Sequence, residues 1–509
     1  MIQEQKIYNP IRHQTIVSIV TPLGEGGIGK IVVSGPDALH IVNGMFRGKG
    51  ITDILNAVSQ RLYYGHIQDK GHIIDEVIVS IIKQQDSFTG EDVVEINCHG
   101  GIRVVMRIYG CLQSSGAEGV AWDSLLLQSV ENKRLDCIQK EALQEVVNAR
   151  TKLAAKVLLD QYRGALSGAI KQGLEVIGKI RRSYHPHPNP PPSRGREALP
   201  SPITSEKASG ELPPPHPLSG KEPDNSSRHT CPSPCERGLG GGENDPRHSN
   251  GVSVPTLASI IGSLLESASF GMALTTPQPL VILGKPNVGK STIINAILGE
   301  ERMLVHHEPG TTRDYVSEYI SVEGIPFEIV DTAGIRHTSD VLEVMSIEMT
   351  QEQLQRASKV MVVFDNARPF DAEDERIADA VHSWLAMNKS ENAQQKTSVS
   401  KVIPVVNKCD LPARLERARI EAEFGQSLCL ISARNKEGFE ELNRRLVREF
   451  DTVYKPMKPV IFNKRQVVLL SKAGSLLKQI PDHFIAEKTL HIMGEVESIL
   501  RACLHSAHP

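Results

Sequence analysis

The sequence predicts a multidomain α/β protein with an N-terminal α+β domain, a helical domain, and an α/β domain inserted into the helical one. Short apolar runs with glycine-bearing turns fill residues 14–110, and apolar residues at helical spacing fill 123–182. Strand and helix patterns then alternate from 279 to 450, and a helical pattern returns after 453. Two helical stretches on either side of an α/β stretch indicate one helical domain with an insertion.

The length and charge of the chain limit what it can be. Its 509 residues suffice for three or four domains of about 150 residues. With 57 Lys and Arg against 60 Asp and Glu, the net charge of −3 argues against a general polyanion-binding surface. Eight scattered Cys suit a reducing cytosol better than a disulfide framework. Without an apolar signal region or a run of 18 apolar residues, we expect a cytoplasmic protein with no membrane span.

The composition changes along the chain predict the domain boundaries. The six segments are the N-terminal domain at 1–122, helical parts at 123–182, 255–276 and 453–509, the inserted α/β domain at 277–452, and a Pro-, Gly- and Ser-rich segment at 183–254. This last segment has too few apolar residues to offset chain entropy, so we expect disorder. A docking role for its proline-rich stretches is the alternative. Cys231 and Cys235 within it lack His partners at metal-ligand spacing.

A glycine-rich stretch in the inserted domain predicts phosphate binding. Gly284–Ser291 fits the pattern G-x-x-x-x-G-K-S and lies between the apolar run LVILG and the helical pattern STIINAIL. Its glycines let backbone N–H groups wrap phosphates, and Lys290 reaches the β and γ oxygens. The Ser291 hydroxyl is placed to ligate magnesium, and the following helix points its positive end at the anion. A purely structural glycine turn is the alternative, and four companion motifs in the expected order argue against it.

Two of the companion motifs would contact the γ-phosphate and magnesium. In Gly310–Asp314 (GTTRD), Thr312 is placed to contact both. Asp331–Gly334 (DTAG) follows the strand pattern FEIV. There Asp331 can hold the metal through water, and the N–H of Gly334 can sense the γ-phosphate.

The other two motifs would contact the base. Asn407–Asp410 (NKCD) follows the strand pattern VIPVV, and Ser432–Arg434 (SAR) follows LCLI. The carboxylate of Asp410 can accept hydrogen bonds from both N1–H and the 2-amino group of guanine. Adenine offers neither donor, so the pocket would select GTP. The predicted GTP contacts are Asn287, Val288, Gly289, Lys290, Ser291, Thr292, His306, His307, Glu308, Pro309, Gly310, Thr311, Thr312, Asp331, Thr332, Ala333, Gly334, Asn407, Lys408, Asp410, Ser432, Ala433 and Arg434.

This set of motifs resembles the translation-factor branch of the Ras-like GTPases over 280–450. The resemblance implies a Ras-like P-loop G domain whose switch segments are ordered by the γ-phosphate. The residue after DTAG is Ile335, where many small GTPases have a catalytic Gln, and an apolar side chain cannot orient water. Asn287 together with GTTRD is similar to the potassium-dependent GTPases that dimerise through their G domains.

That similarity implies further site residues. Potassium would take the place of an arginine finger, with ligands from Asn287, His306, Glu308 and Thr311. Backbone carbonyls could make the contacts at His306 and Glu308, because the side chains there differ from those of the family. Glu343, nine residues beyond DTAG, would orient the attacking water as the catalytic residue. A solvated helix charge is the alternative for Glu343.

The N-terminal domain resembles the tRNA-modification GTPase family (MnmE, also called TrmE) through the segments TIVSIVTPLGEGGIGKIVVSG, DSFTGEDVVEINCHGG and ENKRLDCIQKEAL. The resemblance implies a tetrahydrofolate-binding-like domain that forms a homodimer and takes 5-formyltetrahydrofolate. Its folate contacts would fall on Glu91, Glu95 and Arg134. The family works with a flavoprotein partner, MnmG (GidA), which carries FAD and uses NADH. Together they add a carboxymethylaminomethyl-type group at C5 of the wobble uridine of tRNA, and GTP hydrolysis drives G-domain closure and opening.

Three departures from the family pattern keep alternatives open. Val32 replaces an Arg expected to pair with a folate carboxylate, and Trp122–Val130 (WDSLLLQSV) replaces P-G-E-F-T-x-R-A-F. The chain ends RACLHSAHP instead of C-[IVL]-G-K, so Cys503 is the nearest candidate for the family's reactive thiol, or else a core residue. One alternative is a diverged GTPase without folate-dependent modification. Another is a ribosome-assembly GTPase, although the segment after 450 lacks the GxxG loop of an RNA-binding module.

Overall fold

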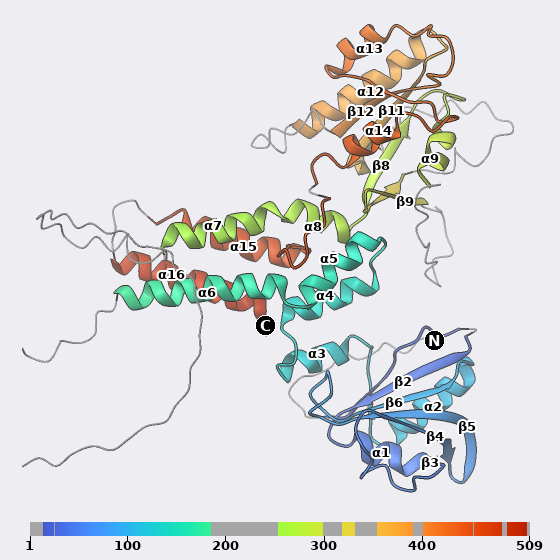
Figure 1. Ribbon diagram of the computed structural model, residues 1–509, viewed down its shortest axis with the longest axis vertical. Helices are drawn as coiled ribbons and strands as arrows, with labels where there is room; N and C mark the ends of the chain where they lie inside the picture. The colour runs from blue at the N-terminus through green and yellow to red at the C-terminus, as the bar shows by residue number, and fades with distance from the viewer. Residues whose placement is uncertain are drawn as a thin grey trace, which may run out of the picture.

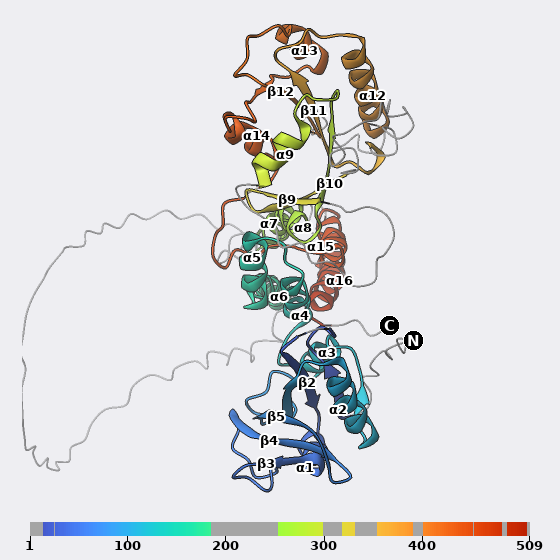
Figure 2. The same cartoon turned by 90° about the vertical axis from the view of Figure 1, so that its right-hand side faces the viewer.

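The computed structural model describes residues 14–24, 26–184, 253–298, 318–330, 354–389, 401–450, 452–480 and 486–505. Three bodies follow one another along the long axis of the molecule (Figure 1): an N-terminal sheet domain, a central helical bundle and a second sheet domain. The view turned by 90° in Figure 2 shows the same order, with the bundle separating the two sheets. This arrangement is the predicted multidomain α/β fold class.

The N-terminal sheet domain contains seven strands in the order β3-β4-β5-β6-β2-β1-β7. Its strands are β1 (Ile16–Ile19), β2 (Ile28–Ser34), β3 (Phe46–Gly48), β4 (Arg61–Asp69), β5 (His72–Ile82), β6 (Val93–His99) and β7 (Glu118–Gly119). Helices α1 (Ala38–Met45) and α2 (Ile102–Ser114) cover one face, because their apolar residues share one core with alternate strand residues such as Val33, Val79 and Ile96. Alternate side chains of each strand therefore point into the core, and the side chains between them lie on the opposite face of the sheet.

The helical bundle is assembled from two distant parts of the chain. Its helices are α3 (Ser124–Glu131), α4 (Cys137–Val147), α5 (Lys152–Tyr162), α6 (Ala165–Tyr184), α7 (Val254–Glu266), α8 (Ala268–Thr275), α15 (Lys464–Leu477) and α16 (Ala486–Leu504). The bounds differ slightly from the predicted ones. Helix α6 continues two residues past 182, where the Ser183 hydroxyl donates to the carbonyl of Ile180 at 2.6 Å. Helix α7 begins at Val254, with Pro255 in its first turn, a position where proline costs no helical hydrogen bond.

The stretch Val254–Thr275 is long and apolar enough to cross a membrane by composition alone. In the structure it is not one helix, because α7 ends at Glu266 and α8 begins at Ala268. Leu257, Ile261 and Leu264 of α7 are buried in the bundle core, where α7 packs against α6 and α15. Its apolar character is explained by burial inside the bundle.

The second sheet domain has six strands in the order β13-β12-β11-β8-β10-β9. The strands are β8 (Gln278–Leu283), β9 (Glu318–Val322), β10 (Ile325–Ile329), β11 (Lys359–Asp365), β12 (Val402–Asn407) and β13 (Cys429–Leu430). The helices described in this domain are α9 (Lys290–Leu298), α12 (Ala372–Lys389), α13 (Arg417–Phe424) and α14 (Phe439–Leu446). All pairs are parallel except β9 with β10, and β11 is buried along its whole length. The carboxyl ends of β8, β11, β12 and β13 therefore meet at one edge, where ligands of such sheets bind.

The bundle contacts the second sheet domain through the turn between β9 and β10. The hydroxyl of Thr151, at the start of α5, donates to the carbonyl of Gly324 at 2.7 Å. Gly324 has a φ of +82°, and a Cβ there would lie 2.6 Å from the Cβ of Leu153. Beside it, the guanidinium of Arg150 lies 4.0 Å from the ring centroid of Tyr319. The hairpin is thus fixed to the end of α5 by close packing and by a hydrogen bond.

The chain also returns from the second sheet domain to the bundle through a hydrogen-bonded segment. The buried carboxylate of Asp160 accepts from the Tyr454 hydroxyl at 2.8 Å and from the N–H of Met457 at 3.0 Å. The side chain of Gln161 bonds the carbonyl of Lys458 and the N–H of Val460. Both of these hydrogen-bonded contacts therefore end at α5, and α8 packs against β10 as a further contact.

Thr151→Val should loosen the contact between the two bodies. The Thr151 hydroxyl also accepts from the N–H of Ala154 at 3.1 Å, so valine removes a helix cap and an interdomain hydrogen bond. We expect a loss of about 2 kcal/mol of stability, at about 1 kcal/mol for each interaction. Faster hydrogen exchange at the β9–β10 turn would report the loss locally. Thr151→Ser keeps the hydroxyl and should exchange like the wild type; equal protection in both variants would contradict the role of this contact.

Candidate functional site

The loop between β8 and α9 has the tight backbone of a phosphate-binding turn. Gly284, Asn287 and Gly289 have positive φ values of +152°, +64° and +100°. A Cβ at Gly284 would lie 2.5 Å from the carbonyl oxygen of Val363, and one at Gly289 would lie 2.3 Å from Nδ2 of Asn407. Both glycines are therefore required by conformation and by space. Asn tolerates the left-handed region better than most residues, which suits position 287.

The lysine of the loop is the first residue of α9 and lies against the loop's own backbone. Nζ of Lys290 donates to the carbonyl of Gly284 at 2.6 Å and to that of Lys285 at 3.0 Å. Burial lowers the pKa of Lys290, because the loop removes water from the ammonium. An anion in the loop would offer this partly desolvated cation a stronger acceptor than a carbonyl. Ser291 and Thr292 follow in the first turn of the same helix.

The base-recognition motif at the end of β12 is bonded directly to the phosphate loop. Nδ2 of the buried Asn407 donates to the carbonyl of Val288 at 2.9 Å, and its Oδ1 accepts from the N–H of Ala433 at 3.0 Å. Nζ of Lys408 donates to the carbonyl of Asn287 at 2.7 Å. Three predicted motifs, which are far apart in the sequence, are thus held together by side chains of two adjacent residues.

The predicted base-selecting carboxylate lies at the open side of this assembly. Asp410 is exposed, and its Oδ1 accepts from the Ser432 hydroxyl at 2.7 Å. That hydrogen bond lowers the pKa of Asp410, so the carboxylate stays charged. Ser432 and Ala433 are buried, whereas Arg434 is exposed beside them. A charged, oriented carboxylate fits the two donors on the Watson–Crick edge of guanine.

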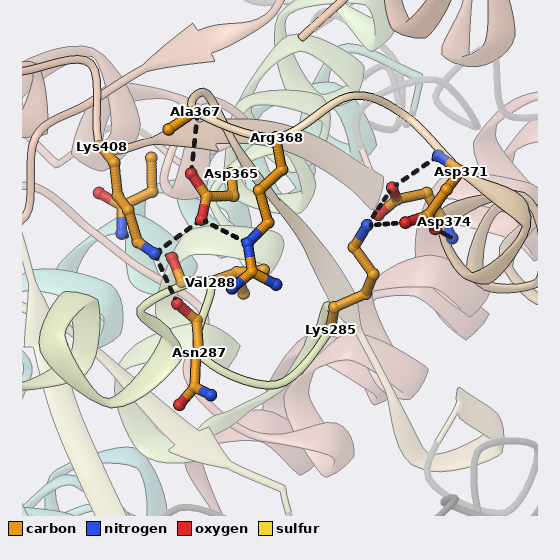
Figure 3. A network of polar contacts seen from close by, with 10 residues as sticks. Lys285, Asn287, Val288, Asp365, Ala367, Arg368, Asp371, Asp374 and Lys408 are labelled. Carbon is orange, nitrogen blue, oxygen red and sulfur yellow. Dashed lines mark hydrogen bonds and ion pairs between the residues drawn. The ribbon is translucent and has the colours of Figure 1, made fainter. Parts of the chain in front are cut away.

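The structure adds an ion-pair cluster that the sequence motifs did not predict (Figure 3). Nζ of Lys285, within the phosphate loop, lies 2.9 Å from Asp371 and 2.7 Å from Asp374. The Lys285 and Asp374 side chains are 6% and 2% exposed. Burial alone would lower the pKa of Lys285, but hydrogen bonds to the two carboxylates outweigh it and raise the pKa. Lys285 therefore fixes the phosphate loop to the start of α12.

A second missed group is the pair that ends β11. Asp365 and Asn366 are buried, and Oδ2 of Asp365 accepts from Nζ of Lys408 at 2.7 Å. The N–H of Asn366 donates to the carbonyl of Asn407 at 2.9 Å. The sequence does carry a signal here, because polar residues directly follow an apolar strand pattern, as they do after β12. No motif in our sequence interpretation used that signal.

Several predicted residues lie outside the described part of the chain. These are His306, His307, Glu308, Pro309, Gly310, Thr311, Thr312, Asp331, Thr332, Ala333, Gly334 and Glu343. Among the described residues, the Ser291 hydroxyl could bind magnesium, and the carboxamide oxygen of Asn287 could bind potassium. Oxygen ligands of this kind suit hard cations, so both positions fit the predicted metal roles, which stay predictions.

In the N-terminal domain, two predicted folate contacts lie at one end of the sheet. Nδ2 of Asn132 is 3.4 Å from Oε1 of Glu91. Nη2 of Arg134 donates to the carbonyl of Gln84 at 2.8 Å. Gly90 has a φ of +79°, and a Cβ there would lie 2.6 Å from the Cβ of Asn132. The TGED segment and the segment around Arg134 therefore form one packed unit, in which Arg134 already bonds the backbone.

The third predicted folate contact lies beside the first departure from the family pattern. Glu95 is the cross-strand neighbour of Val32 and pairs with Nζ of Lys30 at 2.8 Å. Val32 is 4% exposed and belongs to an apolar cluster with Leu125, a residue of the altered segment 122–130. Two of the three departures thus meet in one apolar cluster. Position 32 itself offers no cation to a folate carboxylate, whereas Lys30, two residues earlier on β2, places an ammonium beside Glu95, so the folate contact stays a prediction.

Cys503 is a core residue in this structure. Its side chain is fully buried, and burial raises the pKa of the thiol to about 11. Nη2 of Arg465 donates to its carbonyl at 3.1 Å, which fixes the end of α16 to the start of α15. Reactive cysteines need thiolate character and access, and Cys503 has neither in this arrangement.

Lys285→Met should destabilise the inserted domain by leaving Asp374 as a buried carboxylate without its cation. We expect a loss of about 3 kcal/mol, typical of breaking one side of a buried pair. The double variant Lys285→Met/Asp374→Asn removes both charges and should recover most of that loss. Denaturant unfolding of Lys285→Met, Asp374→Asn and the double variant, analysed as a double-mutant cycle, measures the coupling. Additive effects would show that the two side chains do not interact.

Two family profiles match the chain. Residues 15–121 match "GTP-binding protein TrmE N-terminus", and residues 279–408 match "50S ribosome-binding GTPase". The tRNA modification GTPase MnmE of Geobacillus kaustophilus is 30% identical over 475 residues, which cover 91% of this chain and 88% of the relative. That of Lactobacillus delbrueckii subsp. bulgaricus is 31% identical over 472 residues, which cover 92% and 88%.

A solved structure, the G domain of the T. maritima FeoB iron transporter, matches 34% of this chain and 99% of its own at 22% identity. Its TM-score of 0.24 is too low to add to the assignment. The whole-length relatives carry the conclusion, because their similarity spans the N-terminal sheet, the bundle and the GTPase domain alike. With 30% and 31% identity over nine-tenths of its length, the chain belongs to the MnmE family of tRNA modification GTPases.

Proposed function

We propose that this protein is the GTP-hydrolysing subunit of a complex that modifies the wobble uridine of tRNA at C5. The observation that carries the proposal is the direct bonding of the guanine-recognition motif to the phosphate loop, at 2.7 and 2.9 Å, in a chain with a TrmE-type N-terminal domain. The relatives are named tRNA modification GTPases. The proposal includes a homodimer, a flavoprotein partner of the MnmG type, tRNA as the substrate and a cytoplasmic location.

Different described residues would contact the phosphates, the base and the magnesium ion of bound GTP. Lys290 would leave the carbonyls of Gly284 and Lys285 and bind the β and γ phosphates. Asp410, kept charged by the Ser432 hydroxyl, would accept from N1–H and the 2-amino group of guanine. Magnesium, held through Ser291 and the predicted ligand Thr312, would neutralise charge on the phosphates. Because the phosphate and base loops are bonded together, GTP binds to a site that is already arranged.

Hydrolysis needs a positioned water and a positive charge at the γ-phosphate. With Ile335 after DTAG, the water-orienting role falls to Glu343 in this proposal. Potassium, bound through Asn287, His306, Glu308 and Thr311, would supply the charge between the phosphates when two G domains dimerise. In support, Asn287 lies at the exposed turn of the phosphate loop, in a left-handed conformation held by Lys408.

A second candidate function is supported by the apolar cluster at Val32. Position 32 carries Val in place of the arginine that the family resemblance implies, and Cys503, the nearest candidate for the family's reactive thiol, is buried. The second candidate is therefore a family member that hydrolyses GTP without folate-dependent modification. A ribosome-assembly role has weaker support, since a TrmE-type domain precedes the GTPase domain and a helical bundle follows it.

Potassium should stimulate GTP hydrolysis by the full-length protein relative to sodium at equal ionic strength. We expect the stimulation to be about tenfold or more, because a positive charge at the transition state is worth several kcal/mol. Glu343→Ala should abolish the stimulated rate while GDP affinity stays unchanged. Glu440→Ala, which removes an exposed carboxylate from α14, is the matched control. Equal slow rates in both salts, unaffected by Glu343→Ala, would contradict the potassium mechanism.

Asp410→Asn should change base selectivity. An amide can accept from N1–H but would place its donor against the 2-amino group of guanine, whereas xanthine offers a carbonyl there. We expect GDP affinity to fall by about a hundredfold and XDP affinity to rise, since a hydrogen bond to a charged group is worth about 1.5–3 kcal/mol. Titration with the two labelled nucleotides measures the ratio. An unchanged ratio would place guanine recognition elsewhere.

A further inference from the structure

The buried carboxylate of Asp365 lies behind the nucleotide-binding loops and belongs to none of the GTPase motifs. It is the last residue of β11, next to Asn407 in the sheet register, and its side chain is 3% exposed. Oδ1 accepts from the N–H of Ala367 at 2.9 Å, which closes the turn after β11. Oδ2 accepts from Nζ of Lys408 at 2.7 Å (Figure 3). The two oxygens thus serve different partners.

The Lys408 ammonium is divided between Asp365 and the phosphate loop. It donates to Oδ2 of Asp365 and to the carbonyl of Asn287, both at 2.7 Å. Asn287 has a φ of +64°, a conformation that costs energy for any residue except glycine and needs support from its surroundings. A long, flexible lysine side chain gives such support only if its ammonium is held in place, and Asp365 holds it.

The cationic neighbour Arg368 does not replace this interaction. Its Nε lies 3.8 Å from Oδ2 of Asp365, beyond hydrogen-bonding distance, and its side chain is 57% exposed. Asp365 is therefore charge-paired mainly with Lys408. Removing the Asp365 carboxylate would release the Lys408 ammonium. The hydrogen bond from Lys408 to Asn287, one of the two that join the base motif to the phosphate loop, would then be lost.

We propose that Asp365 is a positioning residue which, acting through Lys408, sets the geometry of the phosphate loop and hence the affinity for guanine nucleotides. It does not read the base. A change at Asp365 therefore affects binding of nucleotides with and without the 2-amino group equally, which separates its role from that of Asp410. This inference rests on the GTPase assignment and not on the proposed potassium mechanism.

The test measures GDP and IDP dissociation constants for full-length Asp365→Asn by titration of labelled nucleotides. The variant keeps an oxygen for the N–H of Ala367 but loses the charge that holds Lys408. We expect both dissociation constants to rise by the same factor, about tenfold, the order expected for one lost charge-assisted hydrogen bond. Glu423→Gln, which removes an exposed carboxylate on α13 beside His382 of α12, is the matched control.

A double-mutant cycle shows whether Asp365 acts through Lys408. Lys408→Met should weaken binding by itself, and Asp365→Asn added to it should weaken binding no further. If Asp365→Asn fails to fold, the double variant, which has no unpaired charge, still gives the comparison with Lys408→Met. The proposal is overturned if folded Asp365→Asn binds GDP within twofold of the wild type, if IDP and GDP respond differently, or if the two substitutions are additive.

Discussion

The nucleotide site depends on the hydrogen bonds that join the end of β12 to the phosphate loop. Asn407 and Lys408 bind two successive carbonyls of that loop, at Val288 and Asn287. Because β12 and β8 are separated by β11 in the sheet, these side chains span a strand to hold together the two loops that are predicted to bind opposite ends of the nucleotide. Gly289 must lack a Cβ for this to occur, since Asn407 occupies that space. Base recognition and phosphate binding are therefore one structural unit.

The same unit is connected to the rest of the molecule at both sides. On one side, the ion pair of Lys285 with Asp374 connects the phosphate loop to α12. On the other side, β8 pairs with β10, and the turn between β10 and β9 accepts a hydrogen bond from Thr151 of the bundle. The chain leaving the domain is bonded to Asp160 and Gln161 of the same helix. A change of position at the sheet would reach α5 through both connections. The hairpin and the returning chain are thus both held by one helix of the bundle.

Much of the fold and of the nucleotide site could be predicted from sequence because the responsible patterns are local. The phosphate loop, NKCD and SAR each combine a strand end with a fixed spacing of polar residues. The fold class followed from the changes in apolar periodicity. The ion-pair partners of Lys285, Asp365 and Asp374 could not be assigned this way, although Asp365 itself ends an apolar strand pattern, because these partners are 43 to 89 residues away in the sequence. Only the sheet order brings them together, and a single sequence does not state that order.

The N-terminal domain shows how departures from a family pattern gain meaning from structure. In sequence, Val32 and the altered segment 122–130 are separate anomalies, about ninety residues apart. In the structure, Val32 and Leu125, a residue of α3, lie in one buried apolar cluster with Val93 and Val120. An arginine at position 32 would need a charged partner, because burial of an unpaired charge is costly, and Glu95 lies directly opposite it on β6. The altered segment also makes a buried polar contact here, because Oε1 of Gln128 accepts from the Ser34 hydroxyl at 2.6 Å, so its environment is partly apolar and partly polar.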